Sequence, residues 1–165
     1  MWLRKLMNWR GSAGESEENM LLLAIDPGPE ASAWVLLRDG LPVWHGKQPN
    51  DALLAAQYEC DRIVIEMIAS YGMPVGREVF ETCVWIGRIM QGFGADRCSR
   101  LTRMEVKNHI CHSSRAKDAN IRRALIDRLG APGTKKSPGP TYGLVADEWA
   151  ALAVAVTWWD QQGKL

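Results

Sequence analysis

Three acidic side chains stand at the ends of apolar segments. Asp26 follows the run "LLLAI" and precedes Pro27-Gly28, Glu66 follows "IVI", and Asp147 precedes "EWAALAVAVT". A carboxylate beside a buried segment is costly unless a partner uses it. Taken singly, Asp26 also suits a turn and Asp147 suits the positive end of a helix dipole, whereas Glu66 has no such explanation. Together, the three predict a shared site.

The chemistry of such a site follows from the repulsion between its carboxylates. If the strands that end at Asp26 and Glu66 are neighbours, both side chains lie at the edge of the sheet where ligands usually bind. A divalent cation would neutralise them, and hard oxygen ligands suit Mg²⁺ or Mn²⁺. Phosphodiester hydrolysis by two ions about 4 Å apart, which activate a water and stabilise the leaving oxygen, is the reaction that this arrangement favours.

Alternating strand-like and helix-like segments must position these acids. Hydrophobic periodicity and turn signals predict strands over 20–26, 31–40, 41–47, 61–67 and 98–106, and helices over 51–59, 74–90, 116–130 and 146–160, with a Gly/Pro/Lys loop over 131–143. This order predicts an α/β fold with a mixed sheet, in which three antiparallel strands and further parallel strands are flanked by α-helices. We expect an N-terminal arm and linker over residues 1–19 and one domain over residues 20–162.

Composition narrows the class of protein. The 165-residue chain is 47% hydrophobic and 24% charged, with a formal net charge of +1. These values are typical of a soluble globular domain and argue against a uniformly basic nucleic-acid wrapper. Without a membrane-length apolar run or a signal-peptide core, we expect a cytoplasmic protein that makes no membrane contact. The four cysteines form no C-x-x-C pair and are expected to be reduced, and "HICH" (109–112) lacks a second half-site for zinc.

The ordered set of motifs resembles a known family. "AIDPG", "VIEM", a basic segment before an amphipathic helix, and "DEWAALAVAVT" span residues 20–160. In this order they resemble the RuvC-type Holliday junction resolvases of the RNase H-like superfamily. The length and the run "GTKKSPGPTYGLVADEWAALAVAVTWWD" resemble the phage-encoded branch, which would place the protein in the host cytoplasm. The resemblance implies an RNase H-like fold and a homodimer that nicks opposing strands of four-way DNA junctions with Mg²⁺ or Mn²⁺, in recombination and repair, without a small-molecule cofactor.

The resemblance also assigns roles to residues. Asp26, Glu66 and Asp147 match the catalytic, metal-holding acids. A fourth ligand is usual three residues after the last acid, where this chain has Ala150. Either Glu148, Asp118 or water supplies the missing oxygen, or the second metal ion is bound weakly, and Glu148 is the preferred candidate.

Basic and aromatic residues complete the predicted DNA surface. Lys107 and Lys117 match basic residues near the scissile phosphate, where a Lys can offset developing charge. The remaining candidates for DNA contact are Tyr71, Arg77, Lys135 and Lys136, and the basic surface is expected to continue through Arg88, Arg97, Arg100 and Arg103. Tyr71 or Phe80 is a candidate to stack on an unpaired base, although a core position is expected for Phe80.

Two other functions use the same residues. A ribonuclease H acting on RNA–DNA hybrids would need the same acids, and cleavage of a hybrid compared with a junction separates the two enzymes. A non-catalytic DNA-binding module would keep the fold without the reaction, and Ala150 favours it. Such a module is expected to bind no Mn²⁺ tightly.

Overall fold

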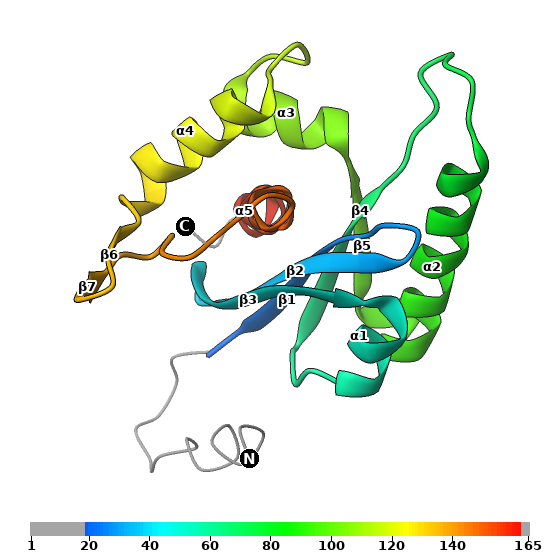
Figure 1. Ribbon diagram of the computed structural model, residues 1–165, viewed down its shortest axis with the longest axis horizontal. Coiled ribbons are helices and arrows are strands. Elements are labelled where there is room, and N and C mark those ends of the chain that lie inside the picture. Colours follow the sequence, from blue (N-terminus) through cyan, green and yellow to red (C-terminus); the bar gives the residue numbers. More distant parts are fainter. Residues whose placement is uncertain (1–18, 163–165) are drawn as a thin grey trace.

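A five-stranded mixed sheet forms the centre of the protein (Figure 1). The computed structural model describes residues 19–162. The sheet has the order β3-β2-β1-β4-β5, and its strands are β1 (Leu21–Asp26), β2 (Ala31–Arg38), β3 (Leu41–Pro49), β4 (Arg62–Met67) and β5 (Cys98–Thr102). The first three strands are antiparallel, whereas β4 runs parallel to β1 and β5 runs parallel to β4. The predicted mixed sheet is confirmed.

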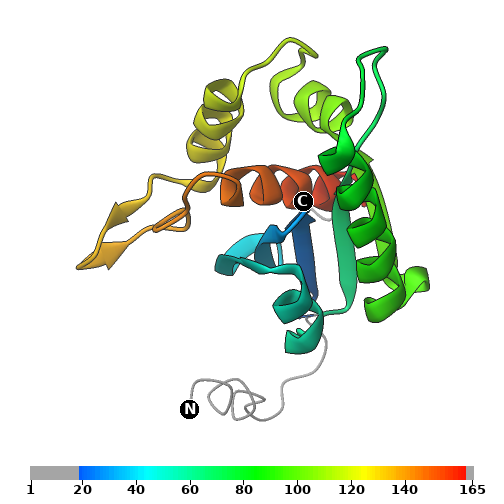
Figure 2. The same ribbon diagram turned by 45° about the vertical axis from the view of Figure 1, so that its right-hand side comes forward.

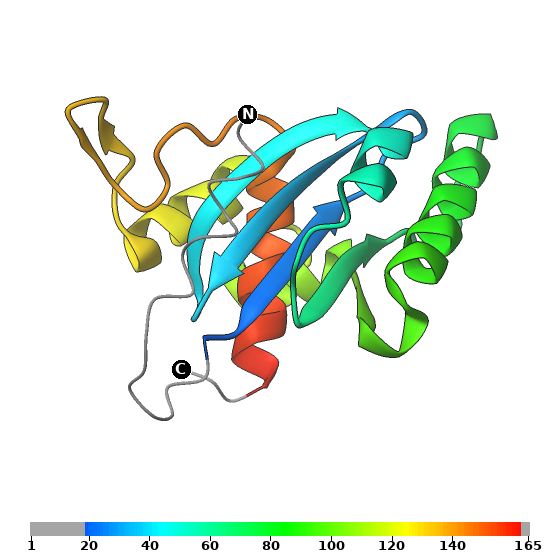
Figure 3. The ribbon, with the colours of Figure 1, turned by 90° about the horizontal axis from the view of Figure 1, so that it is seen from below.

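Helices cover both faces of the sheet (Figures 1 and 3). One face packs against α1 (Asn50–Ala56) and α2 (Arg77–Phe93), and the other against α5 (Glu148–Gln161). Beyond α5 lie α3 (Arg103–Cys111) and α4 (Asp118–Leu129), so that α5 is enclosed between the sheet and these two helices. The sheet has one apolar core on the side of α1 and α2 and another on the side of α5. Successive strand side chains point alternately into these two cores, as the two-residue period of a β-strand requires.

The central position of α5 follows from its composition. All residues from Glu148 to Trp159 are buried except Ala150, and a helix that is apolar on all sides has to be enclosed. Near its end, Asp160 contacts His109 of α3 and Arg128 of α4, each at 2.5 Å. The His109 side chain therefore forms a contact between helices, and the four cysteines are free thiols.

The predicted strand over 98–106 is wrong beyond Thr102. The chain turns there into α3, because the Thr102 hydroxyl accepts a hydrogen bond from the Glu105 amide while the Glu105 carboxylate accepts one from the Thr102 amide. This is a capping box, a local signal that starts a helix. Lys107 consequently lies within α3 instead of following a strand.

Two further differences concern α2 and the loop before α5. The buried residues of α2 are Thr82, Ile86, Ile89 and Phe93. Phe80 lies on the opposite side of this helix and is 61% exposed, so its predicted core position is wrong. The loop over 131–143 contains a short hairpin of β6 (Gly133–Thr134) and β7 (Ser137–Pro138), which projects away from the sheet (Figure 2).

No helix among residues 19–162 is long and apolar enough to cross a membrane. Of the predicted N-terminal arm, residues 1–18 lie outside the described residues. The division into an arm and a domain stays a prediction.

Candidate active site

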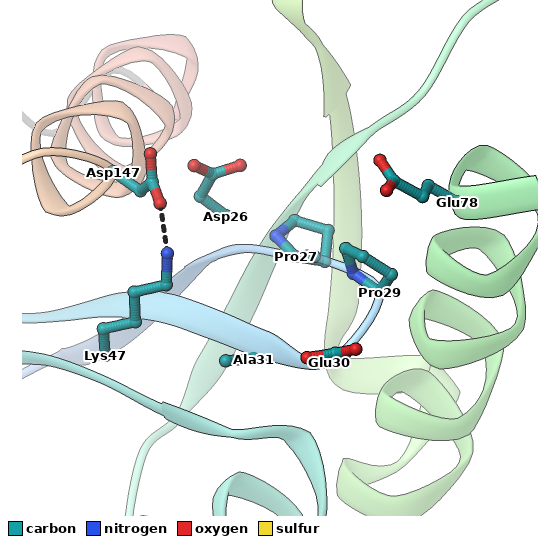
Figure 4. A pocket seen from close by; sticks show the side chains of 9 residues that line it. Asp26, Pro27, Pro29, Glu30, Ala31, Lys47, Glu78 and Asp147 are labelled. Atoms are coloured by element: carbon teal, nitrogen blue, oxygen red, sulfur yellow. Dashed lines mark hydrogen bonds and ion pairs between the residues drawn. The ribbon is translucent and has the colours of Figure 1, made fainter. Parts of the chain in front are cut away.

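An open pocket lies at the carboxyl-terminal end of β1 (Figure 4). Its volume is about 430 Å³, and it is lined by Asp26, Pro27, Gly28, Pro29, Glu30, Ala31, Lys47, Glu78 and Asp147. Because Ile25 of β1 pairs with Ile65 of β4 in parallel register, Asp26 and Glu66 follow at the same edge of the sheet. The start of α5 brings Asp147 to this edge as well. The structure thus collects the three acids that the sequence singles out.

A tight turn after β1 presents Asp26 to the pocket. A Cβ atom at Gly28 would lie 2.5 Å from the Ala31 carbonyl oxygen, so the turn requires glycine at this point. The Asn50 side chain donates a hydrogen bond to the Gly28 carbonyl at 2.9 Å, and the buried Ser32 hydroxyl donates to the Asn50 amide oxygen at 2.6 Å. These contacts fix the backbone next to Asp26.

Asp26 is the least compensated of the three acids. Burial, followed by the negative charges of Glu66 and Asp147, raises the pKa of Asp26 to about 7, although Arg103 and Lys47 act in the opposite direction. Within residues 19–162, no hydrogen bond to its carboxylate is found. A half-buried carboxylate with two acidic neighbours and no donor is a position where a cation would be strongly favoured.

Asp147 is paired with a lysine from the edge strand. The Lys47 Nζ donates a hydrogen bond to Asp147 Oδ2 at 2.5 Å, and both side chains are 51% exposed. This contact raises the pKa of Lys47, so that the ammonium stays charged. Just before Asp147, Ala146 adopts a φ of 42°, a left-handed conformation that residues other than glycine seldom adopt. Such strain often accompanies functional positions.

Glu66 is paired with the first residue of α3. The Arg103 guanidinium donates to Glu66 Oε2 at 3.3 Å and also binds Asp118. Burial raises the pKa of Glu66, while Arg103 and the more distant Lys107 partly counteract this rise. The capping box at Thr102 holds the start of α3, so the same local motif that ends β5 also positions Arg103.

The two protein candidates for a fourth ligand have other contacts. Glu148 is buried, and its Oε2 lies 2.9 Å from His45 Nδ1 and accepts a hydrogen bond from the Val145 amide. Asp118 binds Arg103 on the protein surface. Ala150 contributes no oxygen from its side chain. A role for Glu148 as a ligand stays a prediction.

The three acids are not arranged as a metal centre in this structure. Among the described residues, no three Asp, Glu, His or Cys side chains are arranged so that they could hold an ion as they stand. Their chemistry nevertheless suits Mg²⁺ or Mn²⁺, since these ions prefer carboxylates and water and Asp26 has both oxygens available. Binding would require the carboxylates of Glu66 and Asp147 to be shared with, or released by, Arg103 and Lys47.

Comparison with known proteins agrees with this architecture. Neither a scan against protein-family models nor a search of curated proteins finds a match to the sequence. Two solved structures are similar over 88% of this chain. Thermus thermophilus RuvC in complex with a Holliday junction substrate has a TM-score of 0.64 and 14% identity over 97% of its chain, and Thermus thermophilus RuvC has 0.58 and 15% over 98%. The fold is RuvC-like. The resemblance to the phage-encoded branch stays a prediction.

On this RuvC-like fold the predicted DNA-contacting residues spread around the pocket. Tyr71 is 53% exposed in the loop between Glu66 and α2, and Arg77 is exposed at the start of α2. Lys135 and Lys136 occupy the tip of the β6–β7 hairpin.

Lys107 and Lys117 differ in their relation to the acids. Lys107 is half-buried in α3 and its charge acts on Glu66. Lys117 is exposed just before α4, where its amide donates to the Asn120 side chain. Within residues 19–162, no contact joins the Lys117 side chain to Asp26, Glu66 or Asp147.

The sequence-based reasoning missed three contributors to the site. Lys47 is separated from Asp147 by 100 residues, and only the pairing of β3 beside the start of α5 brings them together. Arg103 was assigned to a general basic surface, without its contact to Glu66. Asn50 carries no signal of its own, because its role depends on the turn that it supports.

Proposed function

We propose that this protein is a divalent-metal-dependent, structure-selective endonuclease that resolves four-way or otherwise branched DNA by paired phosphodiester hydrolysis. The observation that carries the proposal is the convergence of Asp26, Glu66 and Asp147 at the carboxyl-terminal edge of a RuvC-like sheet. The similarity to a RuvC structure that contains a Holliday junction substrate supports the class of substrate. Phosphodiester cleavage is the chemistry that clustered carboxylates and a hard cation serve best.

Asp26, Glu66 and Asp147 would hold Mg²⁺ or Mn²⁺. When bound, such an ion makes a water nucleophilic at neutral pH and stabilises the leaving oxygen. The chain supplies the remaining functions. Arg103 orients the Glu66 carboxylate. We assign Lys107 and Lys117 to the phosphate backbone near the scissile bond, where their charge offsets the charge that develops in the reaction.

The DNA is proposed to cross the pocket between α2 and the β6–β7 hairpin. Lys135 and Lys136 at the hairpin tip would contact phosphates at a distance from the acids, and Arg77 would do so on the side of α2. The exposed ring of Tyr71 would stack on an unpaired base at the crossover. These contacts recognise the shape of a junction more than its sequence.

A homodimer would supply two such pockets for two nicks. The outward side of α2 and the loop before it carry an unusual number of exposed apolar side chains, namely Met73, Val75, Phe80 and Val84. Apolar surface of this kind commonly marks a protein interface. We propose that this surface pairs two copies of the chain.

The test is a cleavage assay on a four-way junction, a linear duplex and an RNA–DNA hybrid, each with and without Mg²⁺. We expect paired nicks in the junction only, and only with the ion. Asp26→Asn should bind the junction without cutting it, whereas Asp51→Asn, a matched change at an exposed position outside the pocket, should cut normally. Normal cleavage by Asp26→Asn would refute the assignment, and preferential cleavage of the hybrid would identify a ribonuclease H.

A non-catalytic DNA-binding module is the second candidate. The observation that favours it is that Lys47 and Arg103 already neutralise two of the three acids. Calorimetric titration with Mn²⁺ separates the two proposals. A module would bind the junction but no Mn²⁺, whereas an endonuclease would bind both.

A further inference from the structure

Lys47 lines the same pocket as Asp26 and Asp147, and it comes from β3, a strand that carries none of the three acids. Its Nζ lies 2.5 Å from Asp147 Oδ2, in the pocket that Asp26 lines (Figure 4). Its charge acts on Asp26 as well as on Asp147. Lys47 therefore lies on the side of Asp26 that faces Asp147, and Arg103 lies on the side that faces Glu66.

The charges of the pocket determine how many metal ions it can accept. Around Asp26, the ion pairs in direct contact are Lys47 with Asp147 and Arg103 with Glu66, so this group holds three carboxylates and two cations. Asp118, which shares Arg103, and the pocket-lining Glu30 and Glu78 are exposed to solvent, where their charges are screened. One divalent cation and one scissile phosphate would bring this cluster to neutrality. A second divalent cation would leave a large excess of positive charge in a half-buried site, which like-charge repulsion disfavours.

The geometry around Asp147 leads to the same conclusion. The Lys47 ammonium donates a hydrogen bond to Oδ2 of Asp147, so this oxygen already has a cationic partner. Three residues further along the same side of α5, where a second carboxylate could share an ion with Asp147, the chain has Ala150. Glu148 contacts His45 and the Val145 amide instead. Asp147 thus contacts a cationic side chain, whereas neither Ala150 nor Glu148 offers a carboxylate that could share a metal ion with it.

An ammonium group can supply part of the positive charge that a metal ion would place beside a phosphate. In a two-ion site the second cation contacts a carboxylate on one side and the leaving oxygen on the other. Lys47 has three N–H donors on a flexible stem, and its contact with Asp147 uses one of them. The other donors can reach a phosphate oxygen in the open pocket.

We propose that Lys47 replaces a second divalent cation, so that the site binds a single ion at Asp26 and Glu66 while Lys47, held by Asp147, contacts the scissile phosphate. This inference rests on the proposed nuclease function; it specifies the metal content and one additional catalytic residue, and it assigns Asp147 to Lys47 in place of the ion.

The test measures the binding of Mn²⁺ alone by calorimetry, in the full-length chain without DNA. We expect one Mn²⁺ per chain for the wild type, for Lys47→Arg, and for Arg62→Met, which removes an exposed cation at the opposite end of the sheet. Lys47→Met should bind Mn²⁺ at least about tenfold more tightly, because a cation within a few ångströms no longer opposes it. Two Mn²⁺ per chain in the wild type, or an unchanged affinity in Lys47→Met, would overturn the proposal.

Junction cleavage provides an independent measurement. Lys47→Met should lower kcat without a matching change in KM, and Lys47→Arg should recover part of the loss. An unchanged kcat in Lys47→Met would also refute the role of Lys47. If the wild type cuts no junction with Mg²⁺, the proposed function itself fails, whereas cleavage combined with two bound Mn²⁺ refutes only the inference about Lys47.

Discussion

Replacing Asp26 by Asn should stabilise the metal-free protein, and the gain should depend on pH. Folding raises the pKa of Asp26 from 3.8 to about 7, mainly through burial. Between these values the folded state keeps a proton that the unfolded state has lost, so the free energy of unfolding falls as pH rises, and above pH 7 the penalty is complete. At about 1.4 kcal/mol per pH unit, the rise corresponds to about 4 kcal/mol. Water at the open side of the pocket screens part of this penalty. We therefore expect Asp26→Asn to raise the free energy of unfolding above pH 7 by about 2–4 kcal/mol.

Urea denaturation in the presence of a chelator measures this effect. At about pH 4, Asp26→Asn and the wild type should unfold at nearly the same urea concentration, whereas at about pH 8 the variant should be the more stable. Asp51→Asn, with a side chain that is 81% exposed, serves as the control and should change stability little at either pH. Equal stability of Asp26→Asn and the wild type at the higher pH would show that the Asp26 carboxylate is not the uncompensated group described above. Saturating Mg²⁺ should restore stability to the wild type but not to the variant.

Three further predictions concern other parts of the molecule. Glu148→Gln should cost about 1–3 kcal/mol of stability in urea denaturation, because it weakens a partly buried contact with His45. Replacing both Lys135 and Lys136 by Ala should weaken junction binding and reduce the slope of log affinity against log salt by about 2, as titrations at several salt concentrations would reveal. Phe80→Glu should shift the protein to monomers in analytical ultracentrifugation without changing its thermal stability, since this side chain is exposed within one chain.

The acids of the candidate site could be predicted because their signals are local. Asp26 and Glu66 each interrupt an apolar strand, and a parallel pairing of those strands is enough to bring them to one edge. Asp147 follows the same logic at the start of an apolar helix. The mixed sheet likewise follows from the hydrophobic periodicity along the chain. The enclosure of α5 agrees with its apolar composition on all sides.

The remaining errors have physical causes. The strand predicted over 98–106 ignored the Thr102-x-x-Glu105 pattern, a capping signal that the sequence does contain. Phe80 was expected in the core on the basis of residue type, although its position on α2 is opposite the buried side. Lys47 could not be found at all, because no pattern within β3 announces a partner 100 residues away.

The place of α5 in the chain has a consequence for synthesis of the protein. Among the described elements α5 comes last in the chain, and it both fills the core between the sheet and α3/α4 and brings Asp147 to Lys47. A chain still emerging from the ribosome has Asp26 and Glu66 but lacks the element that completes the pocket. A nuclease centre in this pocket would therefore be incomplete until α5 has been synthesised and has packed against the sheet, which protects DNA from chains that lack this helix.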